Sequence, residues 1–130
     1  MTPELQMLVY TALLSVLLAF PPLFAAIQAG GLAYAGGNRD EAVELPAWGN
    51  RAARSQMNLL ANLPAFAALV LVAAIAGVSN EQTIFGAQLF FWARVAHAVI
   101  YIAGIPWVRA VAFVASLSGM FDIARALLAA

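Results

Sequence analysis

Four long apolar runs limit what this chain can fold into. They cover residues at about 5–27, 57–77, 84–103 and 107–128. Each is close to the roughly 20 residues that an α-helix needs to cross the hydrocarbon core of a bilayer. A bilayer satisfies no backbone hydrogen bonds, and the runs lack the alternating polarity of membrane strands. We therefore expect an all-α, polytopic membrane four-helix bundle, with residues 1–130 forming a single membrane domain.

The charged residues exclude several classes of function. Only 9% of the 130 residues are charged, 65% are hydrophobic, and the net charge is zero. A nucleic-acid-binding protein normally carries a basic surface patch, so we expect no nucleic-acid partner. The absence of cysteine excludes disulfides, thiolate metal sites and a cysteine nucleophile, and no metal site is expected. All positive side chains are arginines, namely Arg39, Arg51, Arg54, Arg94, Arg109 and Arg125.

Proline and glycine divide the chain. Pro21 and Pro22 interrupt the first run, which predicts a kink near Phe20. The polar stretch 28–50 is expected to be the one sizeable loop and to lie in the cytoplasm, and residues 78–83 and 104–106 are expected to be short turns. The first run is too long for a signal peptide and follows no basic segment, so we interpret it as a retained span.

The arginines also predict an orientation. Arg39, Arg51, Arg54 and Arg109 fall in or beside the first and third connections, whereas the second connection has no positive charge. The positive-inside rule then places the first and third connections in the cytoplasm and both termini outside it. Arg125 is the exception. It follows Asp122 by three residues, so we expect an ion pair on one helix face.

Polar side chains gather on three of the predicted helices. At 100 degrees per residue, Arg51, Arg54, Asn58 and Asn62 lie within about 80 degrees of one another on the second span. Arg94, His97 and Tyr101 share a face of the third span, and Arg109 begins the fourth. Guanidinium groups suit carboxylates and amides suit a peptide backbone. The implied ligand is small, anionic and peptide-like.

Structural explanations remain for most of these residues. Arg51 and Arg54 are near enough to the membrane interface to contact lipid phosphates, and Tyr101 would suit the interface as an aromatic. The two asparagines would serve as interhelical hydrogen-bond donors or acceptors, and His97 as a satisfied interhelical histidine. Arg94 is harder to explain in this way. It lies in mid-span with no acid on its own helix or on the second span, so it needs a partner elsewhere.

Three motifs resemble the MAPEG family, membrane-associated proteins in eicosanoid and glutathione metabolism. The motifs are Arg51-Ala-Ala-Arg-Ser-Gln-Met-Asn58-Leu-Leu-Ala61-Asn-Leu-Pro64-Ala-Phe66, Ala93-Arg94-Val-Ala-His97-Ala-Val-Ile-Tyr101 and Ile105-Pro-Trp-Val-Arg109. The resemblance covers nearly the whole chain and looks like the bacterial branch, which implies an inner membrane. It further implies a homotrimer in contact with membrane lipids, with glutathione bound between subunits in a cytoplasm-facing cleft.

The resemblance also assigns roles to individual residues. Arg54 corresponds to an arginine that binds glutathione carboxylates, and Asn58 to an asparagine that binds the peptide. Arg94 and Tyr101 correspond to residues lining the same cleft, in which Arg51 would take part. Arg109 lies near the place of a catalytic arginine that stabilises the thiolate. The implied activity is that of a glutathione S-transferase or peroxidase acting on lipophilic electrophiles.

One position departs from the family pattern. Family enzymes usually have a glutamate three residues after the asparagine, where it receives the glutathione amino group, and this chain has Ala61. The alternative is therefore a non-catalytic membrane subunit or accessory protein within a larger complex. A four-helix proton-coupled exporter is a poorer match, because that design needs an acid in the first helix and 5–27 contains none.

Overall fold

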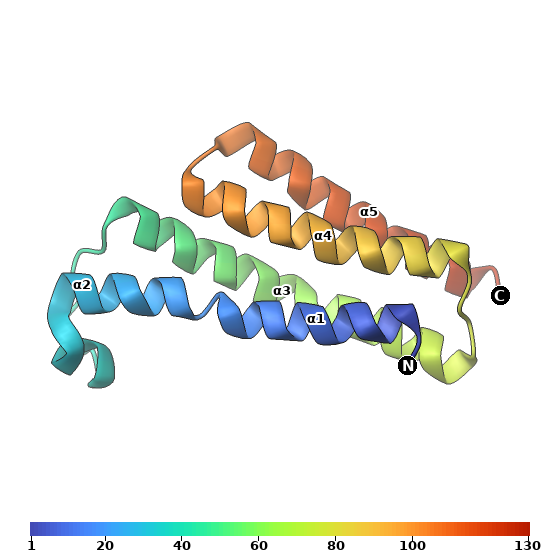
Figure 1. The fold of residues 1–130 in the computed structure, drawn as a ribbon, viewed down its shortest axis with the longest axis horizontal. Coiled ribbons are helices and arrows are strands. Elements are labelled where there is room, and N and C mark those ends of the chain that lie inside the picture. Colours follow the sequence, from blue (N-terminus) through green and yellow to red (C-terminus); the bar gives the residue numbers. More distant parts are fainter.

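The computed structural model describes residues 1–130 as five helices and short connections (Figure 1). The helices are α1 (Pro3–Leu17), α2 (Phe20–Gly36), α3 (Ala47–Ala76), α4 (Glu81–Ala103) and α5 (Pro106–Leu128), with no strand. Taken as one run, α1 and α2 join α3, α4 and α5 as four helical segments long and apolar enough to cross a membrane. The predicted fold class is confirmed.

The break between α1 and α2 lies where the prolines predict it. α1 ends at Leu17 and α2 begins at Phe20, with Pro21 and Pro22 in its first turn. Proline is tolerated there because the first turn of a helix has no internal partners for its amides. The chain bends at this point but continues in the same general direction, so α1 and α2 together follow the length of the molecule (Figure 1).

The first connection is shorter than expected. We predicted a loop over 28–50, but α2 continues to Gly36 and α3 already begins at Ala47. The glycine pair Gly30-Gly31 bends the helix without ending it. Gly31 alone leaves the helical region, with φ 84° and ψ 170°. The second connection is shortened too, because Asn80 caps α4 by accepting hydrogen bonds from the amides of Gln82 and Thr83.

α4 and α5 pack more closely than any other pair of neighbouring helices, through two glycines. A Cβ atom added to Gly86 would lie 2.5 Å from the carbonyl oxygen of Gly119, and one added to Gly119 would lie 2.5 Å from that of Gly86. Beside this contact, the rings of Phe66 on α3 and Phe90 on α4 stack with centroids 4.0 Å apart. Small residues bring the backbones together, as is common between membrane helices.

A buried carboxylate fastens α1 at the end of the molecule that holds both termini. Glu4 is 2% exposed and accepts hydrogen bonds from the hydroxyl groups of Ser79, at 3.0 Å, and Thr83. These partners lie just before α4 and in its first turn, where the helix dipole favours a negative charge. The start of α1 is thereby attached to the connection between α3 and α4.

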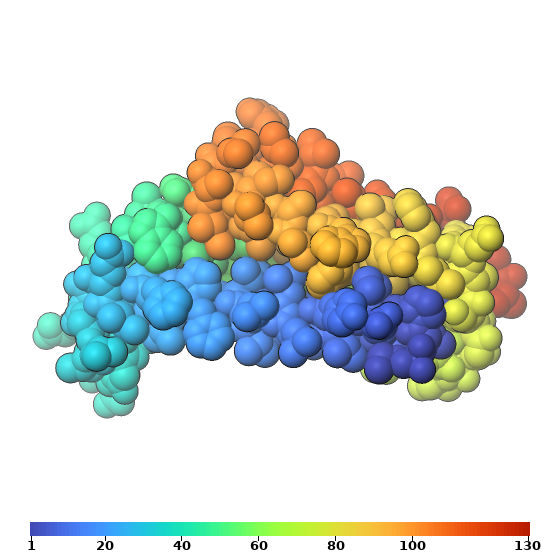
Figure 2. All heavy atoms as spheres, in the orientation of Figure 1, coloured from blue at the N-terminus to red at the C-terminus, as the bar shows by residue number.

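The two ends of the molecule differ. Both termini and the α3–α4 connection lie at one end, and the α2–α3 loop and the α4–α5 turn lie toward the other (Figure 1). In the space-filling view α1 and α2 form a continuous lower edge with α4 above them (Figure 2). Large apolar side chains on every helix remain exposed, among them Leu13, Phe24, Ile75, Trp92 and Val111. Such a surface suits contact with lipid or with another subunit.

We predict that Gly86→Ala destabilises the protein by about 1–3 kcal/mol, because the new methyl group meets rigid backbone on α5. Gly36→Ala is the matched control, since a Cβ there has nothing within 4 Å. Thermal unfolding in detergent micelles, followed by circular dichroism, measures both variants. Equal melting temperatures for the two would contradict the proposed tight contact between α4 and α5.

Candidate anion-binding site

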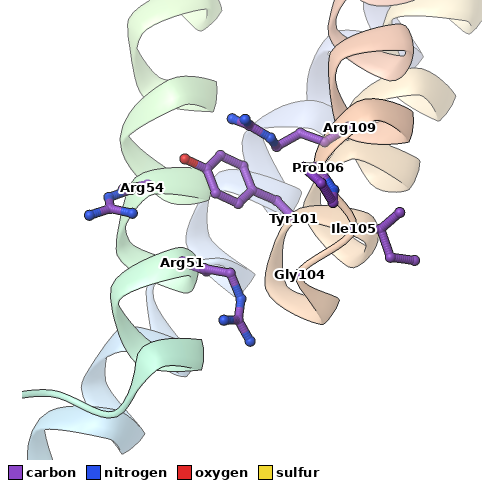
Figure 3. Close-up of a pocket in the computed structure, with 7 residues that line it drawn as sticks. All are labelled: Arg51, Arg54, Tyr101, Gly104, Ile105, Pro106 and Arg109. Atoms are coloured by element: carbon purple, nitrogen blue, oxygen red, sulfur yellow. The ribbon is translucent and has the colours of Figure 1, made fainter.

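Three arginines line a cavity at the end of the molecule opposite the termini. The cavity has a volume of about 200 Å³ and is formed by α3, the end of α4, the α4–α5 turn and the start of α5 (Figure 3). Its lining residues are Arg51, Arg54, Tyr101, Gly104, Ile105, Pro106 and Arg109. Four of the predicted site residues, Arg51, Arg54, Tyr101 and Arg109, therefore meet around one hollow.

The α4–α5 turn shapes one wall of the cavity. Gly104 ends α4 with φ 86°, a left-handed conformation that glycine adopts without strain, and Pro106 starts α5. A Cβ on Gly104 would lie only 3.2 Å from Cζ of Arg51. Arg51 in turn donates from Nε to the carbonyl oxygen of Ile102 at 3.1 Å, so its charge lies at the carbonyl end of α4.

Arg109 is held over an aromatic ring. Its Cζ lies 4.4 Å from the centroid of the Tyr101 ring, within the range of a cation–π interaction. Arg109 extends from α5 toward α3 beside this ring, and Arg51 extends from α3 toward the α4–α5 turn, whereas Arg54 extends to the other side of α3 in this view (Figure 3). The Tyr101 ring thus holds Arg109 at the cavity, while Arg54 is exposed.

Below the cavity, the buried Arg94 pairs with the half-buried Asn58. Arg94 is 1% exposed, and its Nη2 donates to Oδ1 of Asn58 at 2.6 Å. Its Nε and Nη1 atoms have no hydrogen-bond partner. By helix rise Arg94 lies about 10 Å from Tyr101 along α4. Neither Arg94 nor Asn58 lines the cavity, although both are predicted site residues. The partner that Arg94 required is an amide on α3, and two of its nitrogens remain without one.

His97 lies between the buried Arg94 and the cavity-lining Tyr101 on α4. It is 2% exposed, its ring meets that of Tyr101 edge-on with centroids 5.4 Å apart, and Phe113 lies on its other side at 6.3 Å. Its Nδ1 has no hydrogen-bond partner, so the expectation of a satisfied histidine was wrong for this atom. A row of side chains thus leads from the buried interior to the cavity, in the order Arg94, His97, Tyr101 and Arg109.

The two asparagines of α3 behave differently. Asn58 does make the interhelical contact that was considered for it, through Arg94. Asn62 does not, because its amide donates to the backbone carbonyl of Asn58 at 2.8 Å, within the same helix. Ser55, which sequence reasoning passed over, is fully buried on α3 with its hydroxyl unpaired. The turn residues Ile105 and Pro106 were also missed as cavity walls, although a glycine–proline turn beside polar helix ends could have indicated them.

No carboxylate accompanies these positive charges. The only ion pair in the molecule joins Arg125 and Asp122, at 3.9 Å, as the spacing predicts, and Arg125 is 74% exposed. Glu4 is bonded to hydroxyl groups at the far end. The acids of the α2–α3 loop, Asp40, Glu41 and Glu44, are exposed and make no ion pair. The site therefore offers donors for anions and an amide for a peptide, but no acidic group for a cation.

We predict that Asn58→Leu destabilises the protein by about 3 kcal/mol, because Arg94 would lose its only hydrogen bond while staying buried. Asn62→Leu is the control, since it removes only a bond within α3. Denaturant unfolding in mixed micelles gives the free energies. Adding Arg94→Met to Asn58→Leu should recover stability, and a further loss in the double variant would show that the pair does not act as described.

The comparisons with known proteins agree with this architecture. The model of the MAPEG family matches residues 5–129 of the chain. No curated protein and no solved structure matches it. The match spans all five helices, including the three that carry the arginines. With four segments able to cross a membrane and a family match over almost its whole length, this chain belongs to the MAPEG family.

Proposed function

We propose that this protein is a glutathione-dependent transferase or peroxidase that acts on lipophilic electrophiles within the membrane. The observation that carries the proposal is the arginine-lined cavity, in a chain of a family often associated with glutathione. Arg51, Arg54 and Arg109 place three guanidinium groups around one hollow with no competing carboxylate. Such a donor set suits the carboxylates of a small peptide.

The residues at and beneath the cavity have different proposed roles in binding the ligand. Arg54 is exposed at the cavity and would bind a ligand carboxylate, while Arg51 is partly occupied by the end of α4. Asn58 and Arg94 do not line the cavity, so their proposed role is to support it: their hydrogen bond joins α3 to α4 beneath the cavity. Tyr101 forms the cavity wall on α4.

Arg109 is the proposed catalytic residue. Glutathione would supply the thiol that attacks the electrophile. A guanidinium held at 4.4 Å above Tyr101 cannot move freely, so its positive charge stays at the cavity and favours a negative sulfur over a neutral one. Because the chain has no cysteine, it has no thiol of its own for such chemistry.

The apolar surface of α5 gives the proposed electrophile a place beside Arg109. Trp107, Ala110, Val111 and Val114 line a shallow apolar groove on α5, and Trp107 is 83% exposed. A lipophilic substrate would reach this groove from the bilayer without entering water. The large apolar exposure elsewhere supports assembly as a homotrimer, which we propose together with a bacterial inner membrane and both termini outside the cytoplasm.

One observation favours a second function. The site has no acid for the ammonium group of glutathione, and Ala61 occupies an exposed position on the same α3 face as Arg54. A protein that had lost its catalytic role would remain as a non-catalytic membrane subunit of a larger complex. Binding of glutathione distinguishes this alternative from the enzyme, because a site that has lost its catalytic role would not bind it.

We predict that the purified protein binds glutathione and that Arg54→Met weakens binding at least tenfold, about 1.4 kcal/mol. Arg109→Met should reduce the fraction of bound thiolate more than the affinity. Isothermal titration in micelles gives the affinity, and thiolate ultraviolet absorbance gives the ionised fraction. Arg125→Met is the control, because Arg125 is exposed near the other end of α5. Absence of binding by the wild type, or equal losses in the control, would refute the enzyme proposal.

A further inference from the structure

We infer that the thiol held in this site carries no free ammonium group. The site would select an anionic thiol whose amino group is acylated or absent over glutathione, which is a zwitterion at that end. This inference rests on the proposed function, in that a small anionic thiol must bind at the arginines. The inference goes beyond the proposed function because it names which anionic thiol the cavity accepts.

The first step is the balance of charge at the site. Arg51, Arg54 and Arg109 line the cavity, and Arg94 lies buried beneath it. None of these four guanidinium groups is within 4 Å of a carboxylate, because the molecule's one ion pair is elsewhere. A ligand entering the cavity therefore meets positive charge from three helices. Its carboxylates are attracted, and an ammonium group on the same ligand is repelled.

The second step is the supply of hydrogen-bond acceptors, which an ammonium group needs. Oδ1 of Asn58 already accepts from Arg94, and the carbonyl oxygen of Ile102 already accepts from Arg51. The backbone carbonyl of Asn58 accepts from Asn62. The hydroxyl of Tyr101 and the backbone carbonyls at the end of α4 are acceptors, but they carry no full negative charge. An ammonium group would thus enter a site with three guanidinium groups and no carboxylate, at the cost of its hydration.

Acylation removes this conflict without changing the rest of the ligand. An amide is neutral, so it is not repelled by guanidinium groups, and its carbonyl oxygen accepts the hydrogen bonds that the site donates. The guanidinium groups that line the cavity, such as those of Arg54 and Arg109, are donors only. A ligand with more acceptors and no ammonium group matches these donors better than glutathione does.

One position on α3 can reverse the preference. Ala61 is exposed and follows Arg54 by seven residues, so it lies on the same face, one turn beyond Asn58. A carboxylate there would give the site its missing negative charge. Ala61→Glu introduces that charge, and Ala61→Gln is the matched control, with nearly the same shape and no charge.

The test compares glutathione with N-acetylglutathione by isothermal titration in detergent micelles. The wild type is expected to bind N-acetylglutathione at least tenfold more tightly. Ala61→Glu should raise the affinity for glutathione about tenfold and remove the preference, and Ala61→Gln should keep it. Melting temperatures of the three proteins verify that each is folded.

A pH series provides a second readout that needs no variant. With the S-methyl forms of both ligands the thiol cannot titrate, so the two ligands differ at alkaline pH only in the ammonium group of the first. The affinity of the wild type for S-methylglutathione, relative to its affinity for the N-acetyl form, should rise as that ammonium group deprotonates.

The outcomes separate this inference from the proposed function. Equal affinities, or tighter binding of glutathione, would overturn the inference and leave a glutathione enzyme in place. If neither thiol binds the wild type, the proposed function fails and the inference fails with it. If Ala61→Glu does not fold, the wild-type comparison and the pH series still decide the question.

Discussion

The buried guanidinium of Arg94 is the constraint on which the polar part of this structure depends. A charged group in mid-span is costly unless it is paired, and Arg94 has a single hydrogen bond, to Asn58. This bond attaches α4 to α3 at a depth where the other contacts are apolar. Because two guanidinium nitrogens remain unpaired, the fold carries a cost at this depth. The attachment of α4 to α3, the two helices that carry Tyr101 and Arg54, thus depends on one side chain.

The rest of the site depends on how α4 and α5 are joined. The backbone contact between Gly86 and Gly119 sets the two helices close together, and the turn at Gly104 directs α5 back along α4. Tyr101 and Arg109, on either side of this turn, come into cation–π contact as a result. Packing of small residues far from the cavity therefore determines the position of the charge that we propose acts on the thiolate.

The sequence was sufficient for the helices, the proline break and the Asp122–Arg125 pair, because hydropathy, missing amide donors and helix periodicity are local properties. Loop lengths were less predictable, since Gly31 bends α2 without ending it. Helical periodicity also put Arg94 and Tyr101 on one face, but it could not show that the cavity reaches only Tyr101. That depends on how the α4–α5 turn packs against α3, which glycine and proline in the sequence indicate as a turn but do not place in space.

The most direct test of a site completed by an anion is nitrogen NMR of the arginine side chains in micelles. Adding N-acetylglutathione should shift the Nε–H resonances of Arg54 and Arg109, which line the cavity, and leave that of Arg125 unchanged. Unchanged Arg54 and Arg109 resonances at saturating ligand, or an equal shift at Arg125, would contradict the account.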